Sequence, residues 1–277
     1  MGTFGHEEAP RLITAITPTV CALLSIDPPS LSERRPLSEV TQRSHEALAG
    51  HPVQRCLIFC PDAIGAWLPQ KYPSMFAGVL AHAPLRVTLR SVIPPKTPVC
   101  WASVFTGTRP EVHGIRPVSP RPTFHGDTLF DALIRARKKT AIVAVTDSSI
   151  DRVFRGRDLD YFAERYDPEV TARVLALLEA GGHDIIVAYQ QEYDDVMHQS
   201  TPESREAIRA VAHHVDAFRL IADAVARHWR SHNRAIMWLT DHGTHVDPAT
   251  GRGTHGDDIP ADMAVEHFFG FQLAVGE

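Results

Sequence analysis

The side chains in this sequence best suited to metal chemistry are three aspartates and three histidines that follow apolar segments. They are Asp62, Asp194, His198, Asp241, His242 and His255. One aspartate after a strand is most often a turn former or a helix cap, and Asp-His pairs are common in solvated loops. The same pattern after three apolar segments is much less expected by chance. Mixed carboxylate and imidazole ligands suit two zinc ions, which together can stabilise the attacking and leaving oxygens of a displacement.

Thr97 is the candidate nucleophile. It is followed by Pro98 and an apolar segment, and a Thr cap with Pro at the first position is an ordinary helix start. The same position would place the hydroxyl among free N–H groups that attract phosphate, and a metal on its oxygen would favour the alkoxide. The spacing alone leaves the capping role and the nucleophilic role equally open.

The segments that position these residues predict an α/β fold. Strands are expected at 55–60, 85–93, 140–145, 184–189, 235–239 and 268–274, and helices at 16–24, 98–105, 128–138, 168–180 and 202–229. This alternation predicts a mostly parallel central sheet with helices on both faces. Ligands of such sheets bind beyond the carboxyl ends of the strands, which is where the aspartates and histidines fall.

The composition is that of an ordinary globular chain. Its 277 residues, 44% hydrophobic and 22% charged, are enough to bury a sizeable core. We expect a single domain over residues 1–277, in which residues 1–50 form an N-terminal extension that packs on the rest, without a large cap domain. The net charge of −5 disfavours a nucleic-acid polymer as partner.

Features that would direct the chain to a membrane or an oxidising compartment are not expected. We find no signal peptide and no apolar run of the roughly 20 residues that span a bilayer. The four cysteines form no C-x-x-C pair, so a structural zinc knuckle is not expected either. We therefore expect a reduced, cytoplasmic protein that binds no membrane, and leave its oligomeric state open.

The motifs around these residues resemble those of the alkaline phosphatase superfamily, especially its nucleotide pyrophosphatase/phosphodiesterase branch and phosphonoacetate hydrolase. Residues 94–115 are similar to a nucleophile segment in which Thr opens a helix that ends in Thr-Gly and is followed by His-Gly-Ile. Three further motifs are similar to those of the family's metal ligands and follow in its order. They are Asp194-x-x-x-His198, Thr240-Asp241-His242-Gly243 and Thr254-His255-Gly256.

This resemblance implies an alkaline-phosphatase-like fold and a hydrolase of small phosphodiesters, phosphomonoesters or phosphonates. It implies two divalent metal ions, with Zn²⁺ favoured and Mn²⁺ also suited. One ion would be held by Asp62, Thr97, Asp241 and His242, and the other by Asp194, His198 and His255. Thr97 would attack phosphorus and form a phospho-threonine, which water would then release.

The sequence departs from the family pattern at Cys100, where the diesterase branch has an Asn that contacts a phosphoryl oxygen. A thiol is only a weak donor. We nevertheless take Cys100 and its neighbour Trp101 as candidate substrate-binding residues, although Trp101 would also suit the core. Asp195 is an alternative to Asp194 as ligand. We expect His113 to hold a turn and His245 to be a loop residue.

Two other functions remain open at this stage. One is a phosphomutase or phosphotransferase on the same scaffold, and the other is a metal-binding relative with weakened catalysis. A sulfatase is less favoured, because the superfamily's sulfatases need a Cys or Ser that is converted to formylglycine, and Thr97 cannot be converted.

Overall fold

The computed structural model describes residues 11–33, 35–118 and 123–275, which fold around one large sheet. This sheet has seven strands in the order β2-β9-β6-β1-β5-β3-β4. The strands are β1 (Arg55–Pro61), β2 (Leu85–Arg90), β3 (Thr140–Val145), β4 (Asp160–Glu164), β5 (Ile185–Gln190), β6 (Arg234–Trp238) and β9 (Ala264–Gln272). Only β9 pairs antiparallel, with β6 and β2, among the described strands of this sheet. The prediction of a mostly parallel sheet is confirmed.

The central strands are buried on both faces, as their continuous apolar runs predict. β1 lies between β5 and β6, and its register sets where the chain leaves the sheet. Pro61 of β1 pairs with Gln190 of β5, and Phe59 of β1 pairs with Trp238 of β6. The residues that follow these three strands therefore emerge at the same edge.

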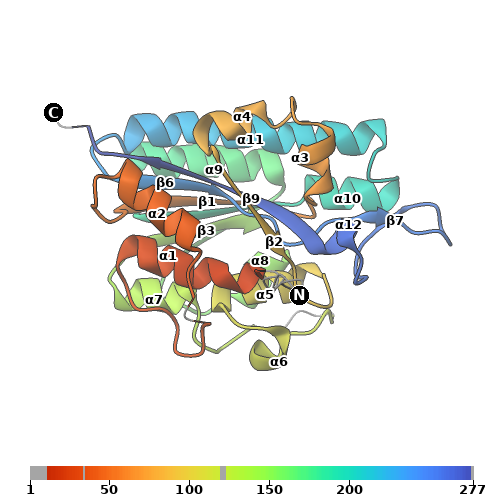
Figure 1. Ribbon diagram of the computed structural model, residues 1–277, viewed down its shortest axis with the longest axis horizontal. Coiled ribbons are helices and arrows are strands. Elements are labelled where there is room, and N and C mark those ends of the chain that lie inside the picture. The colour runs from red at the N-terminus through yellow and green to blue at the C-terminus, as the bar shows by residue number, and fades with distance from the viewer. Residues whose placement is uncertain (1–10, 34, 119–122, 276–277) are drawn as a thin grey trace, which may run out of the picture.

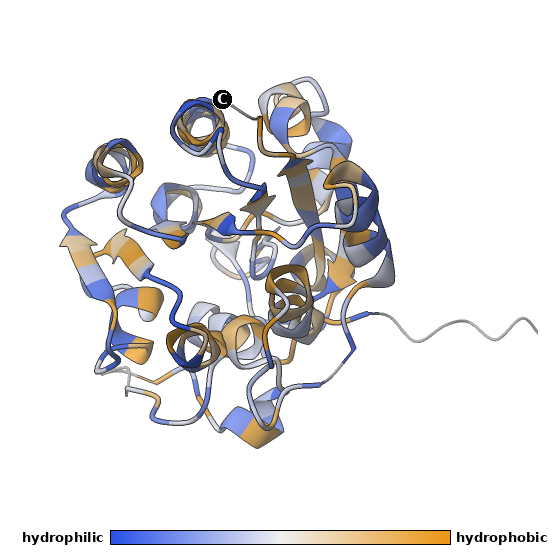
Figure 2. Ribbon diagram, turned by 90° about the vertical axis from the view of Figure 1, so that its left-hand side faces the viewer, coloured by the Kyte–Doolittle hydropathy of each residue, from blue (hydrophilic) through white to orange (hydrophobic). Residues whose placement is uncertain are grey.

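Helices cover both faces of the sheet (Figure 1). One layer contains α3 (Trp67–Lys71), α4 (Ala77–His82), α9 (Asp167–Ala180), α10 (Glu192–Gln199) and α11 (Arg205–His228). The other contains α1 (Ile16–Leu24), α2 (Ser38–Ala47), α5 (Thr97–Thr106), α6 (Pro110–His113), α7 (Leu129–Arg135) and α8 (Ser149–Val153). Figure 2 shows the largely hydrophobic strands between these two layers.

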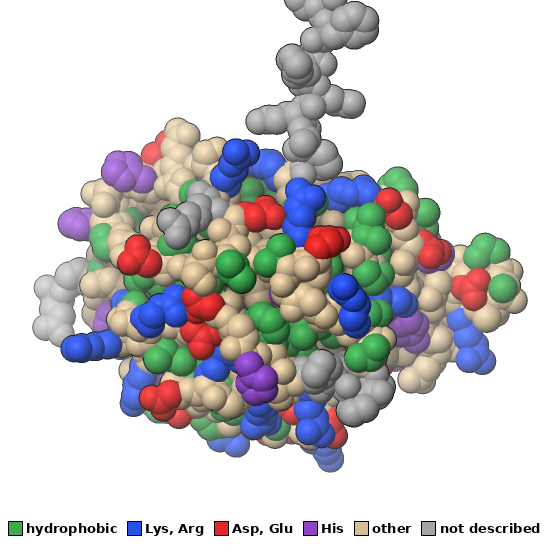
Figure 3. Space-filling view, turned by 90° about the horizontal axis from the view of Figure 1, so that it is seen from below, with side chains coloured by type: hydrophobic (Ala, Val, Ile, Leu, Met, Phe, Trp, Pro, Cys, Tyr) green, Lys and Arg blue, Asp and Glu red, His purple; other side chains and the backbone are tan. Residues whose placement is uncertain are grey.

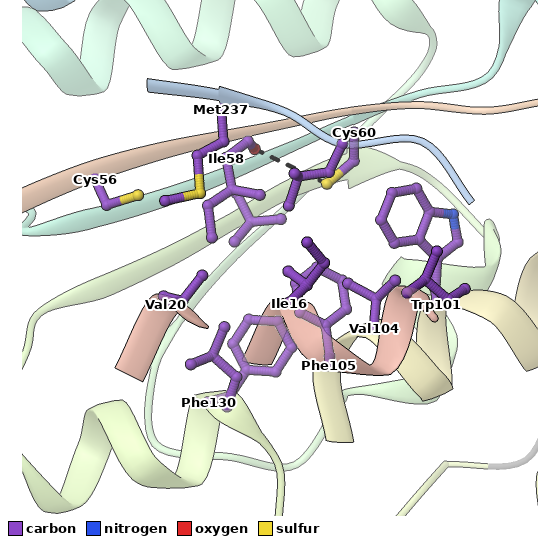
Figure 4. Close-up of a cluster of buried hydrophobic side chains, with 14 of the residues drawn as sticks. Ile16, Val20, Cys56, Ile58, Cys60, Trp101, Val104, Phe105, Phe130 and Met237 are labelled. Carbon is purple, nitrogen blue, oxygen red and sulfur yellow. Dashed lines mark hydrogen bonds between the residues drawn. The ribbon is translucent and has the colours of Figure 1, made fainter. Parts of the chain in front are cut away.

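Each layer closes over its own hydrophobic cluster. In the cluster of Figure 4, Ile16 of α1 and Phe105 of α5 lie beneath Ile58 of β1. Ile16 is completely buried, so the described part of the predicted N-terminal extension contributes to the core. The remaining elements are the 3-10 helix η1 (Ile13–Ala15), β7 (His245–Val246), β8 (Gly253–Thr254) and α12 (Pro260–Met263).

Several element boundaries differ from those predicted. The helix predicted over 16–24 does begin at Ile16, directly after η1, and its Thr17 hydroxyl donates to the Val104 carbonyl oxygen at 2.6 Å; the strand predicted over 85–93, in contrast, ends at Arg90. Residues 38–47 form a helix, α2, that is not among the predicted helices. The segment between Asp147 and Asp167 contains α8 and β4 and thus continues the main fold.

The face of the molecule shown in Figure 3 has no large patch of only positive or only negative side chains. Lys and Arg side chains are mixed there with Asp and Glu side chains. Among the described residues, none of the helices combines the length and the apolar character needed to cross a bilayer.

Candidate active site

The structure brings the predicted ligands together beyond the carboxyl ends of the parallel strands. Asp62 follows β1, Asp241 and His242 follow β6, and Asp194 and His198 lie on α10, which follows β5; His255 follows β8. Among the described residues they form two groups, Asp62–Asp241–His242 and Asp194–His198–His255. In each group, one potential ligand atom from each residue lies within 4.8 Å of the others. These spacings suit a shared cation.

Thr97 lies against the first group. Its Oγ1 is 3.2 Å from Nε2 of His242 and 3.5 Å from Oδ1 of Asp62. α5 begins at Thr97 itself, with Lys96 as its N-cap and no side-chain capping bond. Of the two roles that the spacing left open for Thr97, the structure does not show the capping one, because the cap falls one residue earlier and the hydroxyl faces Asp62 and His242.

The two groups adjoin each other. The imidazole ring of His242, from the first group, stacks on that of His255, from the second, with centroids 3.9 Å apart and planes at 17°. Within the second group, Oδ1 of Asp194 is 3.4 Å from Nε2 of His198 and 3.5 Å from Nε2 of His255. One substrate phosphoryl group could therefore contact ions in both groups.

Backbone carbonyls fix the protonation of the three histidines. Nδ1 of His242, His198 and His255 lies 3.1, 3.1 and 2.8 Å from a carbonyl oxygen, respectively of Gly243, Gly253 and Pro95. A carbonyl oxygen only accepts, so each Nδ1 carries the proton and each Nε2 presents a lone pair. In metal sites, contacts of this kind from the other ring nitrogen orient the ligating histidine.

The electrostatics also fit cations. Burial lowers the pKa of His242 to about 3 and lowers the pKa values of His255 and His198, so neutral imidazoles are favoured. Burial raises the pKa of Asp241 well above its usual value, and the charge of Asp62 raises it further. Oδ2 of Asp241 is buried and makes no hydrogen bond among the described residues; its neighbour at 3.3 Å is the Nε2 of His242. Two electron-donating atoms that face each other in this way fit a metal ion between them.

Tyr189 is a site residue that the sequence did not reveal. Its hydroxyl donates to Oδ2 of Asp62, which leaves Oδ1 toward Thr97. The backbone N–H of Ala63 similarly donates to Oδ1 of Asp241 at 3.1 Å. The available signal was a tyrosine at the end of an otherwise apolar strand, where a buried hydroxyl needs a partner.

Two cavities meet at Thr97 and Asp194. One has a volume of ≈ 280 Å³ and is polar; its lining includes Thr146, Ser148 and Gln191. The other has a volume of ≈ 320 Å³, and Lys96, Pro98 and Val118 contribute to its lining.

The two candidate substrate-binding residues do not reach these cavities. Cys100 and Trp101 are both 0% exposed. Cys100 Sγ lies 3.2 Å from the Ser91 hydroxyl, and the Trp101 ring packs in the core against Phe105 and Tyr189. In this structure both side chains therefore lie in the core and not against the cavities, which does not support the prediction of substrate contacts.

Three further residues named from the sequence, Asp195, His113 and His245, lie outside the two ligand groups. Asp195 Oδ2 accepts hydrogen bonds from Tyr166 and Gln191 and belongs to neither ligand group. His113 accepts from the backbone N–H of Ile115 at 3.0 Å, which holds the turn after α6. His245 bonds Asp262, also outside the two groups.

The comparisons with known proteins agree with this fold. The sequence profile of the type I phosphodiesterase / nucleotide pyrophosphatase family matches residues 76–117, which include Thr97. No curated protein sequence matches the chain. Inactive murine ectonucleotide pyrophosphatase / phosphodiesterase 5 in complex with AMP is similar in structure, with a TM-score of 0.54 and 16% identity over 69% of this chain and 57% of that one.

Two further structures are similar. A 2-O GAG sulfatase gives a TM-score of 0.55 and 13% identity over 79% of this chain and 64% of that one. Phosphonoacetate hydrolase from Sinorhizobium meliloti 1021, in complex with phosphonoformate, gives a TM-score of 0.49 and 16% identity over 71% of this chain and 59% of that one. This TM-score is too low to carry an argument. This chain thus spans less than two thirds of each of these proteins. The identities are low, so the likeness concerns the fold.

Proposed function

Because this chain has the alkaline phosphatase superfamily fold and a segment matching the type I phosphodiesterase profile, we propose that it hydrolyses phosphate-type esters with Thr97 as nucleophile. One observation carries this proposal: the Thr97 hydroxyl does not cap its helix but lies 3.5 Å from Asp62 and 3.2 Å from His242. This position would place the hydroxyl beside a cation held by Asp62 and His242, as a nucleophile on phosphorus requires.

The residues that would hold two divalent ions are those of the two groups. Asp62, Asp241, His242 and the Thr97 oxygen would hold one ion, and Asp194, His198 and His255 the other. Three-residue sets of this composition suit Zn²⁺ best and also accept Mn²⁺. When bound, the ions would favour the Thr97 alkoxide and offset the negative charge of the phosphoryl oxygens.

The proposed reaction has two displacements at phosphorus, the first by Thr97 and the second by water. Thr97 Oγ1 forms a bond to phosphorus while the bond from phosphorus to the leaving alcohol breaks, which gives a phospho-threonine and the free alcohol. Water attacks this phospho-threonine and regenerates the hydroxyl. The Thr97 hydroxyl points its donor toward Oδ1 of Asp62 at 3.5 Å, and its proton leaves with the departing alcohol. Two displacements give net retention at phosphorus.

The cavities favour a substrate with two substituents on phosphorus. A phosphodiester or an ester of a phosphonate has two, whereas a phosphomonoester has one. Space on both sides of Thr97, one side polar and the other bounded by Lys96 and apolar residues, supports the first two classes. We therefore propose a small diester or phosphonate ester as substrate.

The test compares Thr97→Ala with wild type on an aryl phosphodiester, an aryl phosphonate ester and an aryl phosphomonoester, with zinc or manganese present. We expect turnover of the diester or phosphonate ester to exceed that of the monoester. Thr97→Ala should lower kcat/KM at least roughly 10³-fold with nearly unchanged metal content. Acid quenching of wild type should trap the phosphoryl group, with its remaining substituent, on Thr97.

Thr128→Ala is the matched control, because Thr128 also stands at a helix start but caps α7 with its hydroxyl. This variant should lose about 1 kcal/mol of stability and keep its activity. Full turnover by Thr97→Ala would exclude Thr97 as nucleophile. Transfer to an added alcohol in place of water would favour the phosphotransferase alternative, and two bound ions without turnover would favour the weakened relative.

A further inference from the structure

A buried carboxylate outside both ligand groups holds the loops that carry them. Asp262, on α12, is 0% exposed. Its Oδ2 accepts from the backbone N–H of Gly256 at 2.8 Å and of Asp257 at 3.0 Å, and its Oδ1 lies 2.8 Å from Nδ1 of His245. Its own carbonyl oxygen accepts from the backbone N–H of Gly243 at 2.7 Å.

These contacts connect the two groups of potential ligands. Gly243 directly follows His242 of the first group, and Gly256 directly follows His255 of the second. Asp262 therefore contacts the residue next to one histidine from each group. The rings of His242 and His255, one from each of these loops, stack on each other.

Gly243 and Gly256 allow the two loops to approach their neighbours closely, because neither has a side chain. A Cβ on Gly243 would collide with the carbonyl oxygen of Ala261, beside Asp262. Gly256 has a φ of +130°, and a Cβ on it would collide with the Lys96 side chain. The Lys96 ammonium in turn donates to the His255 carbonyl oxygen, and His255 Nδ1 lies 2.8 Å from the Pro95 carbonyl oxygen. The His255 loop is thus fixed on one side to Asp262 and on the other to the residues before Thr97.

We propose that Asp262 is a positioning residue that fixes the His242 loop and the His255 loop relative to each other, so that metal binding at the two groups is cooperative. This inference rests on the proposed function for its two ions. A buried carboxylate that accepts several N–H bonds holds its donors strongly, since each such bond is charge-assisted. Partners of this kind affect metal affinity without touching the metal.

Asp262→Asn gives the sharpest test because it keeps the shape of the side chain. One oxygen remains, which can serve either His245 or the N–H groups of Gly256 and Asp257, and the new NH₂ group faces the other donors. Titration of the metal-free protein with Zn²⁺ should show the second ion bound about 10- to 100-fold more weakly than in wild type. Cooperativity between the two ions should fall, and kcat should fall more than KM changes.

Two matched carboxylates serve as controls. Asp247→Asn removes an acceptor of the Ala249 N–H and the Thr250 hydroxyl, at an exposed tip next to β7, and should leave metal binding unchanged. Asp257→Asn removes a charge that lies 3.3 Å from the other side of His245 and should change metal affinity much less than Asp262→Asn. Together they separate the hydrogen bonds of Asp262 from its charge.

A second variant covers the case in which Asp262→Asn folds poorly. His245→Ala removes one bond of Asp262 and leaves those to Gly256 and Asp257, so it should weaken cooperativity to a smaller degree. Wild-type affinity and cooperativity in both variants would overturn the proposed role. That result would leave the proposed function intact. Full turnover by the Thr97→Ala variant, in contrast, would overturn the proposed function whatever the Asp262 variants show.

Discussion

The Tyr189 hydroxyl donates a hydrogen bond to Oδ2 of Asp62 from the end of a neighbouring strand. Both residues are buried, and β1 and β5 are paired in register up to this point. The bond occupies one oxygen of the carboxylate and leaves the other, Oδ1, near Thr97 and His242. Tyr189 thus sets which Asp62 oxygen is available as a ligand.

Tyr189→Phe should weaken metal binding at the first group. Without the hydroxyl, Oδ2 of Asp62 loses its donor, and the carboxylate can turn away from Thr97. We expect about 10- to 100-fold weaker binding of one ion, with a matching fall in kcat/KM at limiting metal. Metal titration of the chelated protein measures this. Tyr161→Phe is the control, since its hydroxyl bonds the Phe154 carbonyl oxygen; equal effects of both variants would contradict the assignment.

Removal of the metals should abolish turnover and lower thermal stability. Asp62 and Asp241 are buried together, and a bound cation offsets their mutual repulsion. Zn²⁺ at about 100 times its Kd should add about 2.7 kcal/mol of stability per independent site. The melting temperature should therefore rise on titration with Zn²⁺ or Mn²⁺ and fall with a chelator. Activity that survives complete chelation would contradict a metal-dependent mechanism.

His113 should contribute to acid unfolding. Its Nδ1 accepts from the Ile115 N–H, and burial lowers its pKa from 6.5 to about 4. The folded state therefore binds this proton less readily than the unfolded state. Its stabilising contribution is complete above pH 6.5 and is lost as the pH falls toward 4, by at most about 1.4 kcal/mol per pH unit. Denaturant unfolding of the metal-free protein at several pH values measures this. The free energy of unfolding should fall less steeply with falling pH in His113→Gln than in wild type between pH 6.5 and 4, and equal slopes would contradict the prediction.

Cys100 should be replaceable without loss of catalysis. It is completely buried and contacts Ser91, so it touches neither cavity. Cys100→Ala should lower stability by about 1 kcal/mol and change kcat/KM by less than about tenfold, which corresponds to 1.4 kcal/mol. Cys100→Asn, which restores the family's residue, should overpack the core and lose about 1–3 kcal/mol of stability. A gain in diesterase activity in that variant would show that the position faces substrate after all.

The sequence by itself determined six of the seven strands of the sheet and the polar residues at its edge; β4 was not predicted. Buried parallel strands have continuous apolar runs, and the polar residues after β1 and β6 stand directly beyond such runs, so local pattern located Asp62, Asp241 and His242. The order of the family motifs located Thr97, Asp194, His198 and His255. These signals are local and need no knowledge of strand register.

Only the tertiary structure decided how those residues are used. Whether the Thr97 hydroxyl caps α5 or faces Asp62 depends on where the helix begins relative to β1, a contact across 35 residues of chain. Every residue of α5 is buried, so its apolar pattern does not reveal that Trp101 packs against Phe105 and Tyr189 while Thr97 lies beside Asp62. Tyr189 and Asp262 carry no motif of their own, and it is strand register and loop packing that place them beside the two groups.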